Sequence, residues 1–186
     1  MNQIIAKFDE LLSLFPAGSL QLKQGASETG LSDLEAMLQT PLPDSLRHLL
    51  SNSNGQKEAG ATLLGQFRFL PAEIVSDDYR LHLKYSQEIK NTDAATLHDN
   101  RVLREKTWHP GWISIGRIFN NSLFIDQAPT TNGRFGQIVI WNGDDCFGRV
   151  VARDFEHLLS RTLLLAKQTT FDAELGFSFQ YDSLPI

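Results

Sequence analysis

The sequence lacks a second cysteine, because Cys146 is the only one among its 186 residues. No internal disulfide can form, and we expect the chain to reside in a reducing compartment. The sequence also lacks any apolar run long enough to cross a membrane. Residues 1–7 do not show the basic segment and apolar run of a secretory signal peptide. We therefore expect a cytoplasmic protein that does not engage a membrane.

The sequence also has fewer basic residues than acidic residues. The chain carries 17 Lys and Arg residues against 22 Asp and Glu residues, which gives a formal net charge of −5. Proteins that bind nucleic acids usually rely on a basic surface, so we expect no nucleic-acid partner. A mildly acidic surface is compatible with a basic protein partner.

The sequence contains no recognisable catalytic or cofactor motif. It has no Gly-x-Ser-x-Gly elbow, no Walker loop and no dinucleotide fingerprint. Cys146 follows two aspartates, which disfavour a reactive thiolate. We predict no catalytic residue, no cofactor-binding residue and no metal ligand, and therefore a protein that is not an enzyme. The five histidines, none of which forms a close pair with metal-ligand spacing, are His48, His82, His98, His109 and His157.

Apolar residues at helical spacing predict several amphipathic helices. The first covers residues 3–15 and ends at Pro16, and we expect its apolar stripe to pack against the core rather than against a partner. Ser27 and Asp154 are the expected N-caps of two later helices. Pro43 is expected in the first turn of another helix, where its missing N–H costs nothing.

Alternating apolar residues and turn signals predict a sheet. Residues 113–115 and 123–125 alternate as strands do, and Asn120 and Asn121 between them suit a tight hairpin. The polar stretch 91–107 reads as a loop. Together the elements predict an α+β fold with a twisted, mainly antiparallel sheet packed with helices. Further strands are expected at 65–70, 137–141, 146–151 and 176–181.

Asp126 is the carboxylate with the most informative position, because it ends a predicted strand shortly before Pro129 and Gly133. One interpretation is structural: its oxygens accept backbone N–H groups and fix the following loop. The other is chemical, with Asp126 as a ligand or a catalytic acid. A general acid–base pair needs a partner that the sequence does not identify, which favours the structural interpretation.

Short motifs follow one another in order along the chain: Leu42-Pro43, Asn54-Gly55, Trp112 to Gly116, Asp126, Pro129, Gly133 and Gly136 to Val139. This series resembles the SUKH superfamily, in the branch of the yeast Smi and Knr cell-wall regulators and their bacterial relatives. The resemblance covers roughly residues 23–165. The chain departs from the family pattern in three places: it has Asp154 where serine is usual, its polar stretch 91–107 is long, and its tail from residue 169 onward has no counterpart. We expect partner specificity to differ most in the polar stretch and the tail. The motif positions, mainly structural, are Leu42, Pro43, Gly55, Trp112, Asp126, Pro129, Gly133, Gly136 and Gln137.

The resemblance implies an α+β fold and binding rather than catalysis. In this family bacterial members are thought to be immunity proteins that neutralise toxins, and fungal members act as regulatory scaffolds in cell-wall signalling. The leading hypothesis is therefore a bacterial immunity-type protein that neutralises a toxin domain by stoichiometric binding. The alternatives are a regulatory scaffold in cell-envelope assembly or signalling, and a small-molecule sensor or enzyme with Asp126 in its site.

We interpret the chain as a single domain, 1–186. It divides into an N-terminal amphipathic helix within 1–22, a core at about 23–165 and a C-terminal extension at 169–186. Residues that bind a protein partner are expected among exposed acids and one tryptophan beside the polar loop. These candidates are Glu73, Asp77 and Asp78 at the start of a helix, Trp108, and the hairpin acids Asp144 and Asp145.

Overall fold

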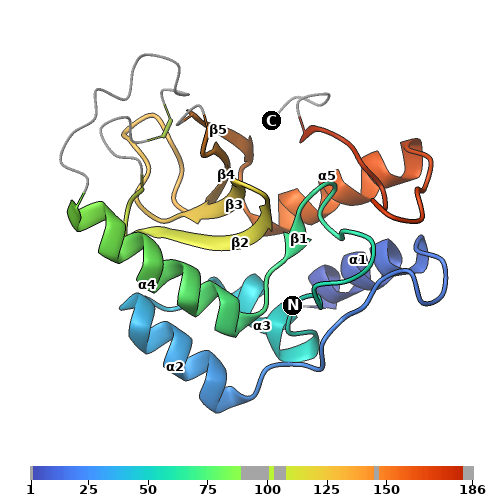
Figure 1. Cartoon of the computed structure of the whole chain (residues 1–186), viewed down its shortest axis with the longest axis horizontal. Coiled ribbons are helices and arrows are strands. Elements are labelled where there is room, and N and C mark those ends of the chain that lie inside the picture. The colour runs from blue at the N-terminus through green and yellow to red at the C-terminus, as the bar shows by residue number, and fades with distance from the viewer. Residues whose placement is uncertain (1, 89–100, 103–107, 145–146, 182–186) are drawn as a thin grey trace.

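A computed structural model describes residues 2–88, 101–102, 108–144 and 147–181 (Figure 1). Within these ranges the chain forms helices on both sides of one antiparallel sheet, which confirms the expected α+β fold. None of the helices within them is both long and apolar enough to span a membrane. In chain order the elements are α1 (Asn2–Ser13), α2 (Glu28–Leu38), α3 (Asp44–Asn52), β1 (Arg68–Phe69), α4 (Ala72–Glu88), β2 (Trp112–Ile118), β3 (Asn121–Asp126), β4 (Gln137–Asn142), β5 (Phe147–Ala152) and α5 (Phe155–Gln168).

The sheet is a simple meander in which the strand order follows the chain order, β1-β2-β3-β4-β5, with every neighbouring pair antiparallel. Helix α4 packs against β2, and α5 packs against β4 and β5 (Figure 1). The expected apolar–polar alternation is not seen in the burial of β2, where every residue from Trp112 to Gly116 is buried. Burial along consecutive residues means that both faces of this strand are covered.

Local capping signals define two of the helices as the sequence predicted. The Ser27 hydroxyl accepts the Gly30 N–H at 3.1 Å, and the Asp154 carboxylate accepts the His157 N–H at 2.7 Å. Each bond satisfies an N–H that has no partner within its own helix. Pro43 lies at the N-cap of α3, one position before the expected first turn.

Helix α1 belongs to the core. Ile4, Phe8 and Leu11 on its apolar stripe are buried, and the helix packs against α5. Lys7 adds an ion pair of 2.7 Å to Glu156 of α5. The interpretation of the stripe as a core face is therefore confirmed.

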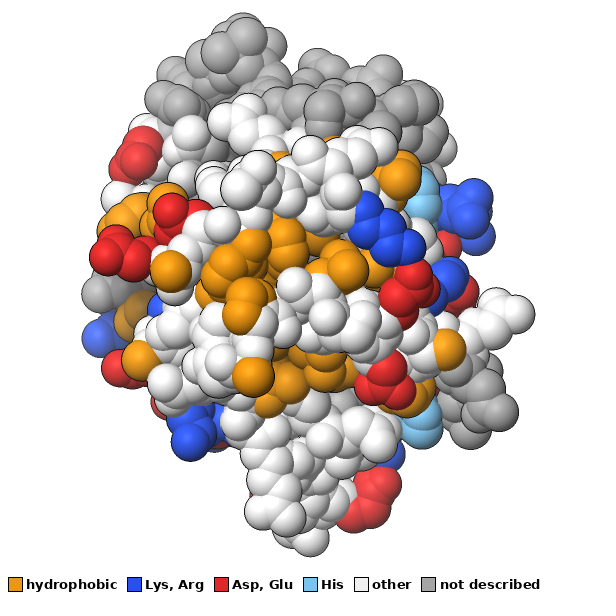
Figure 2. Space-filling model, turned by 90° about the vertical axis from the view of Figure 1, so that its right-hand side faces the viewer, with side chains coloured by type: hydrophobic (Ala, Val, Ile, Leu, Met, Phe, Trp, Pro, Cys, Tyr) orange, Lys and Arg blue, Asp and Glu red, His pale blue; other side chains and the backbone are white. Residues whose placement is uncertain are grey.

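The segment after α5 does not form the strand expected at 176–181. Gly176 adopts a positive φ of 77°, which breaks a regular strand, and makes isolated bridges to Thr62 and Asp172. Phe177 is buried, and its ring centroid lies 5.0 Å from that of Phe15 and 5.2 Å from that of Phe171. Figure 2 shows apolar side chains gathered on the face formed by this segment and the neighbouring ends of α1 and α5.

The strand expected at 65–70 shrinks to two residues. Leu64 and Phe67 exchange two backbone hydrogen bonds of 3.0 Å across a turn in which Gly65 has a φ of 62°. This turn uses the backbone groups that a longer strand would present to the sheet. Its effect is to leave β1 as a short edge strand beside β2.

Candidate functional site

Some of the motif residues, among them Trp112 and Gln137, meet around the buried carboxylate of Asp126, at the end of β3. Its Oδ1 accepts the Trp112 indole N–H at 3.0 Å and the Ala128 backbone N–H at 2.9 Å. Its Oδ2 accepts the Gln137 amide at 2.9 Å. The carboxylate thus ties β2, β4 and the loop after β3 to one point.

Gln137 extends this network to two further backbone segments. Its Nε2 also donates to the Arg101 carbonyl at 2.8 Å, and its Oε1 accepts the Arg134 N–H at 3.1 Å. Gly133 permits the close approach, because a Cβ there would lie 2.5 Å from the Arg101 carbonyl oxygen and 2.6 Å from Pro129 Cβ. In this chain the position of Gln137 uses both ends of a side-chain amide, and the position of Gly133 leaves no room for a Cβ.

Asp126 is fully buried, with none of its surface exposed. Burial raises the pKa of this carboxyl, and the hydrogen bonds from Gln137, Ala128 and Trp112 oppose that rise. The bond from Ala128 confirms that the carboxylate accepts a backbone N–H and fixes the following loop. The arrangement is suited to holding three strands in register, and it presents no open oxygen to a substrate.

The acids expected on the surface do not form one patch. Glu73 accepts hydrogen bonds from Lys23 and from Asn54, the latter at 2.9 Å, and lines a pocket of about 360 Å³ between α2 and α4. Asp77 forms an ion pair of 3.1 Å with Arg80. Each of these charges is matched by a neighbouring cation, which reduces the acidic field that a basic partner would meet.

The hairpin acids lie at another part of the molecule. Asp144 is exposed, and its carboxylate accepts the Asn120 side-chain amide at 2.7 Å. This bond holds the β4–β5 hairpin against the β2–β3 turn. Asp145 lies outside the described residues.

Two candidate contact residues are buried, so the expectation that they are exposed is wrong. Asp78 faces the sheet and forms an ion pair of 2.5 Å with Arg117, since α4 packs directly on β2. Trp108 is 4% exposed, with its ring centroid 5.3 Å from that of Tyr79 and 5.6 Å from that of His82. Helix α4 covers this tryptophan, which the neighbouring polar sequence had suggested would be partly open.

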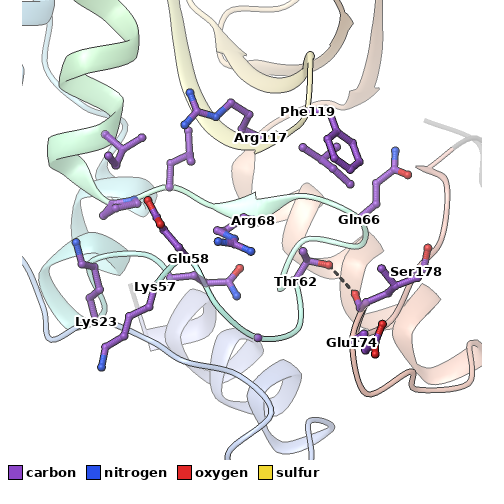
Figure 3. Close-up of a pocket in the computed structure, with 17 residues that line it drawn as sticks. Lys23, Lys57, Glu58, Thr62, Gln66, Arg68, Arg117, Phe119, Glu174 and Ser178 are labelled. Atoms are coloured by element: carbon purple, nitrogen blue, oxygen red, sulfur yellow. Dashed lines mark hydrogen bonds between the residues drawn. The ribbon is translucent and has the colours of Figure 1, made fainter.

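A larger pocket, of about 920 Å³, lies beside β1 and was not predicted from the sequence. Its walls come from β1, the β2–β3 turn, the segment before β1 and the segment after α5. Figure 3 shows Arg68 in the middle of the lining residues, with Lys57 toward one end and Glu174 and Ser178 toward the other. Charged groups of both signs and apolar side chains therefore meet in one concave surface.

Phe119 stands on the rim of this pocket and is 91% exposed. It occupies the β2–β3 turn with a positive φ of 48°, which is rare for a bulky residue. The sequence placed the turn at Asn120 and Asn121, whereas the structure places it at Phe119 and Asn120. An aromatic residue beside an Asn-Asn pair was the signal that could have identified an exposed anchor.

Among the described residues, no group of three or more His, Cys, Asp or Glu side chains is placed to hold a metal ion. Of the histidines that the structure describes, His82 stacks on Trp108, and His157 lies in the first turn of α5.

Comparison with known proteins identifies a family and two fungal relatives. Residues 25–161 match the SMI1 / KNR4 family (SUKH-1). The chain is 28% identical over 154 residues to a cell wall biosynthesis/cell cycle regulator smi1 of Schizosaccharomyces pombe, covering 75% of this chain and 31% of that protein. It is 24% identical over 176 residues to a glucan synthesis regulatory protein of Neurospora crassa, covering 75% and 33%. The chain thus spans about a third of the length of these relatives.

Proposed function

Because the chain belongs to the SMI1 / KNR4 family (SUKH-1), we propose that it is a non-enzymatic protein-binding module that acts by stoichiometric contact with a partner. The observation that carries this proposal is the pocket beside β1 with Phe119 on its rim. Binding energy in protein interfaces concentrates in a few large side chains that become buried on contact. Phe119 offers such a side chain, already placed next to a concave surface.

The backbone conformation of Phe119 supports the same proposal. A non-glycine residue in the left-handed region costs free energy, and such strain gathers at functional sites. Nothing in the fold requires a phenyl ring at this position, because the ring contributes almost no burial. An asparagine would suit the turn better and would remove the ring.

The more specific form of this function is that of an immunity-type protein, which neutralises a toxin domain in the cytoplasm by covering its active surface. The resemblance to bacterial SUKH proteins and the formal net charge of −5 support this form. A second form, a regulatory scaffold in cell-envelope assembly, is supported by the names of the two fungal relatives.

Affinity purification of the tagged full chain from its native cells tests the function. One stoichiometric toxin domain is the result expected of an immunity protein, and several envelope or signalling proteins are the result expected of a scaffold. Phe119→Asn is expected to reduce recovery of the partner. Phe135→Asn is a matched control, because Phe135 is 67% exposed and lies outside the pocket lining. If recovery of the partner falls equally in both variants, or in neither, the partner does not bind at this pocket.

A further inference from the structure

We infer that the pocket beside β1 binds a partner segment that carries a carboxylate next to an apolar side chain, with the Arg68 guanidinium binding the carboxylate. The inference rests on the proposed protein-binding function and names the chemistry of the partner at the same site.

Arg68 and Arg117 stand directly opposite each other in the register of β1 and β2. Like charges placed opposite each other across an antiparallel pair repel. Asp78 neutralises Arg117 through an ion pair of 2.5 Å. Arg68 has no such relief, since its side chain makes no ion pair or hydrogen bond with any residue in the described part of the chain.

The position of Arg68 makes it a good carboxylate-binding group. Its side chain is half-buried and lies in the middle of the pocket lining (Figure 3). A guanidinium that has lost part of its hydration gains more from a carboxylate than an exposed one does, and its planar fork matches two carboxylate oxygens. Lys57 and Glu58 add one charge of each sign to the same lining, so the Arg68 guanidinium remains the excess charge at this side of the pocket (Figure 3). Lys23 and Arg117 are already paired with Glu73 and Asp78.

The remaining walls specify an apolar neighbour for that carboxylate. Ile118 and Phe119 line the pocket from the β2–β3 turn, and Leu175 lines it from the segment after α5. Phe119 is 91% exposed and Leu175 is 58% exposed, so both hold apolar surface that an occupant would bury. Removing such surface from water is the main favourable contribution to most protein association.

The occupant is recognised by its side chains rather than by addition of a strand to the sheet. The outer edge of β1 is already closed, because the Phe69 N–H donates to Gln56 Oε1 and the Phe69 carbonyl accepts the Gln56 N–H, both at 2.9 Å. A sheet edge without unpaired groups offers no ladder to a new strand. The contact with Arg68 therefore decides which segments bind.

The pocket also has features that belong to this chain rather than to the matched family region. Glu174, Leu175 and Ser178 lie beyond residues 25–161 and form the wall farthest along the chain. The carboxylate of Glu174 at this end disfavours a second acid there, so the acidic group of the partner is directed toward Arg68. The segment after α5 thus acts as a specificity element for the occupant.

Selection of a random dodecapeptide library displayed on phage against the full chain tests the inference. We expect enriched sequences with Asp or Glu beside an aromatic or aliphatic residue. A synthetic peptide of the consensus should lose about tenfold or more in affinity for Arg68→Gln, and the wild type should lose as much for the peptide with Gln in place of its acid. Arg80→Gln is the matched control, because Arg80 pairs with Asp77 on α4 outside this pocket.

The outcomes separate this inference from the proposed function. A consensus without an acid, the absence of any enrichment, or equal affinity of wild type and Arg68→Gln overturns the assignment of the carboxylate. The partner captured from cells can bind Arg68→Gln as tightly as wild type and still fail to bind Phe119→Asn. That result would support protein binding at the pocket and contradict the role of Arg68. Thermal unfolding of Arg68→Gln close to that of wild type shows that a loss of affinity is not a loss of fold.

Discussion

The hydroxyl of Thr62 donates a hydrogen bond of 2.8 Å to the carbonyl oxygen of Leu175, and this bond joins two parts of the chain that lie 113 positions apart. Thr62 belongs to the region matched by the family, and Leu175 belongs to the segment that follows it. The backbone of Thr62 also pairs with Gly176. The segment after α5 is therefore attached where the pocket is formed, which leads us to treat it as part of the folding unit.

Phe177→Ala should destabilise the protein by about 3 kcal/mol, since truncation of a buried phenylalanine removes apolar contacts and leaves a cavity. Phe177 is 6% exposed and packs against Phe15 and Phe171. Urea unfolding followed by tryptophan fluorescence measures the change. Leu175→Ala is the control, with an expected change within about 0.5 kcal/mol because its side chain is mostly exposed. A Phe177 variant as stable as the control would show that the extension folds separately.

Asp126→Asn should lower the free energy of unfolding by about 2 kcal/mol, because a buried donor would then face another donor. The Asp126 oxygens accept three hydrogen bonds, and the Gln137 amide that donates to Oδ2 also holds the Arg101 carbonyl. An asparagine cannot accept on both sides without turning that amide around. Chemical denaturation measures the loss, with the exposed Asp144→Asn as its control.

Unchanged stability of Asp126→Asn together with loss of a measurable activity would contradict the structural interpretation and favour the sensor or enzyme hypothesis.

The direction in which the pKa of Asp126 is shifted provides a second check. Since burial raises the pKa of Asp126, the folded state binds this proton more readily than the unfolded state does, and the contribution of Asp126 to stability falls as the pH rises through the folded pKa. Asp126→Asn removes that dependence.

Local chemistry explains which parts of the fold the sequence predicted. Ser27 and Asp154 cap their helices through bonds to residues three positions away, so the pattern and its result lie in one short window. The network around Asp126 was predicted in part, as a motif with a loop-fixing carboxylate. Its partner Gln137 comes from the next strand, and only the sheet register brings the two together.

The pocket could not be predicted, because its residues are neighbours only in the folded chain. Arg68 meets Arg117 through strand pairing, and Glu174 arrives through the bridge at Thr62. The burial of Trp108 has the same origin, since α4 supplies the rings that cover it. Polarity of the adjacent sequence predicts exposure only where no distant element packs over the residue.

Gln56→Leu should cost about 3 kcal/mol or more, because it leaves several buried backbone groups without partners. Gln56 Oε1 accepts the N–H groups of Leu63 and Phe69 at 2.9 Å, and Nε2 donates to the Ala61 carbonyl at 2.8 Å. Gln66→Leu is the matched control, since this half-buried residue lines the same pocket and makes no side-chain hydrogen bond within the described ranges.

Differential scanning calorimetry at fixed pH compares the two glutamine variants. A large drop in melting temperature for Gln56→Leu and a small one for Gln66→Leu is the expected result. Equal melting temperatures would mean that the edge of β1 does not depend on this side chain. Amide exchange at Phe69 should also become faster in the Gln56 variant, because the bond that protects its N–H is lost.

His82 should make the protein less stable as the pH falls from 7 toward 5.5. Burial lowers the pKa of this imidazole below its ordinary value of 6.5, with Asp78 opposing the shift and Arg117 adding to it. The unfolded state therefore binds the proton more readily. The contribution of His82 to the free energy of unfolding is fully present above the pKa that this residue has in the unfolded state, and it is lost as the pH falls through its pKa in the folded state. The slope is at most about 1.4 kcal/mol per pH unit for one proton.

His82→Phe should flatten this dependence while preserving the packing, because a phenyl ring can stack on Trp108 as the imidazole does, at a centroid distance of 5.6 Å and an interplanar angle of 11°. Urea unfolding at half-unit steps between pH 7 and 5.5 measures the slope, above the range where most carboxylates titrate. His157, whose pKa is also lowered by burial, accounts for the slope expected to remain. A variant with the full wild-type slope would show that the pH dependence of stability arises from groups other than His82.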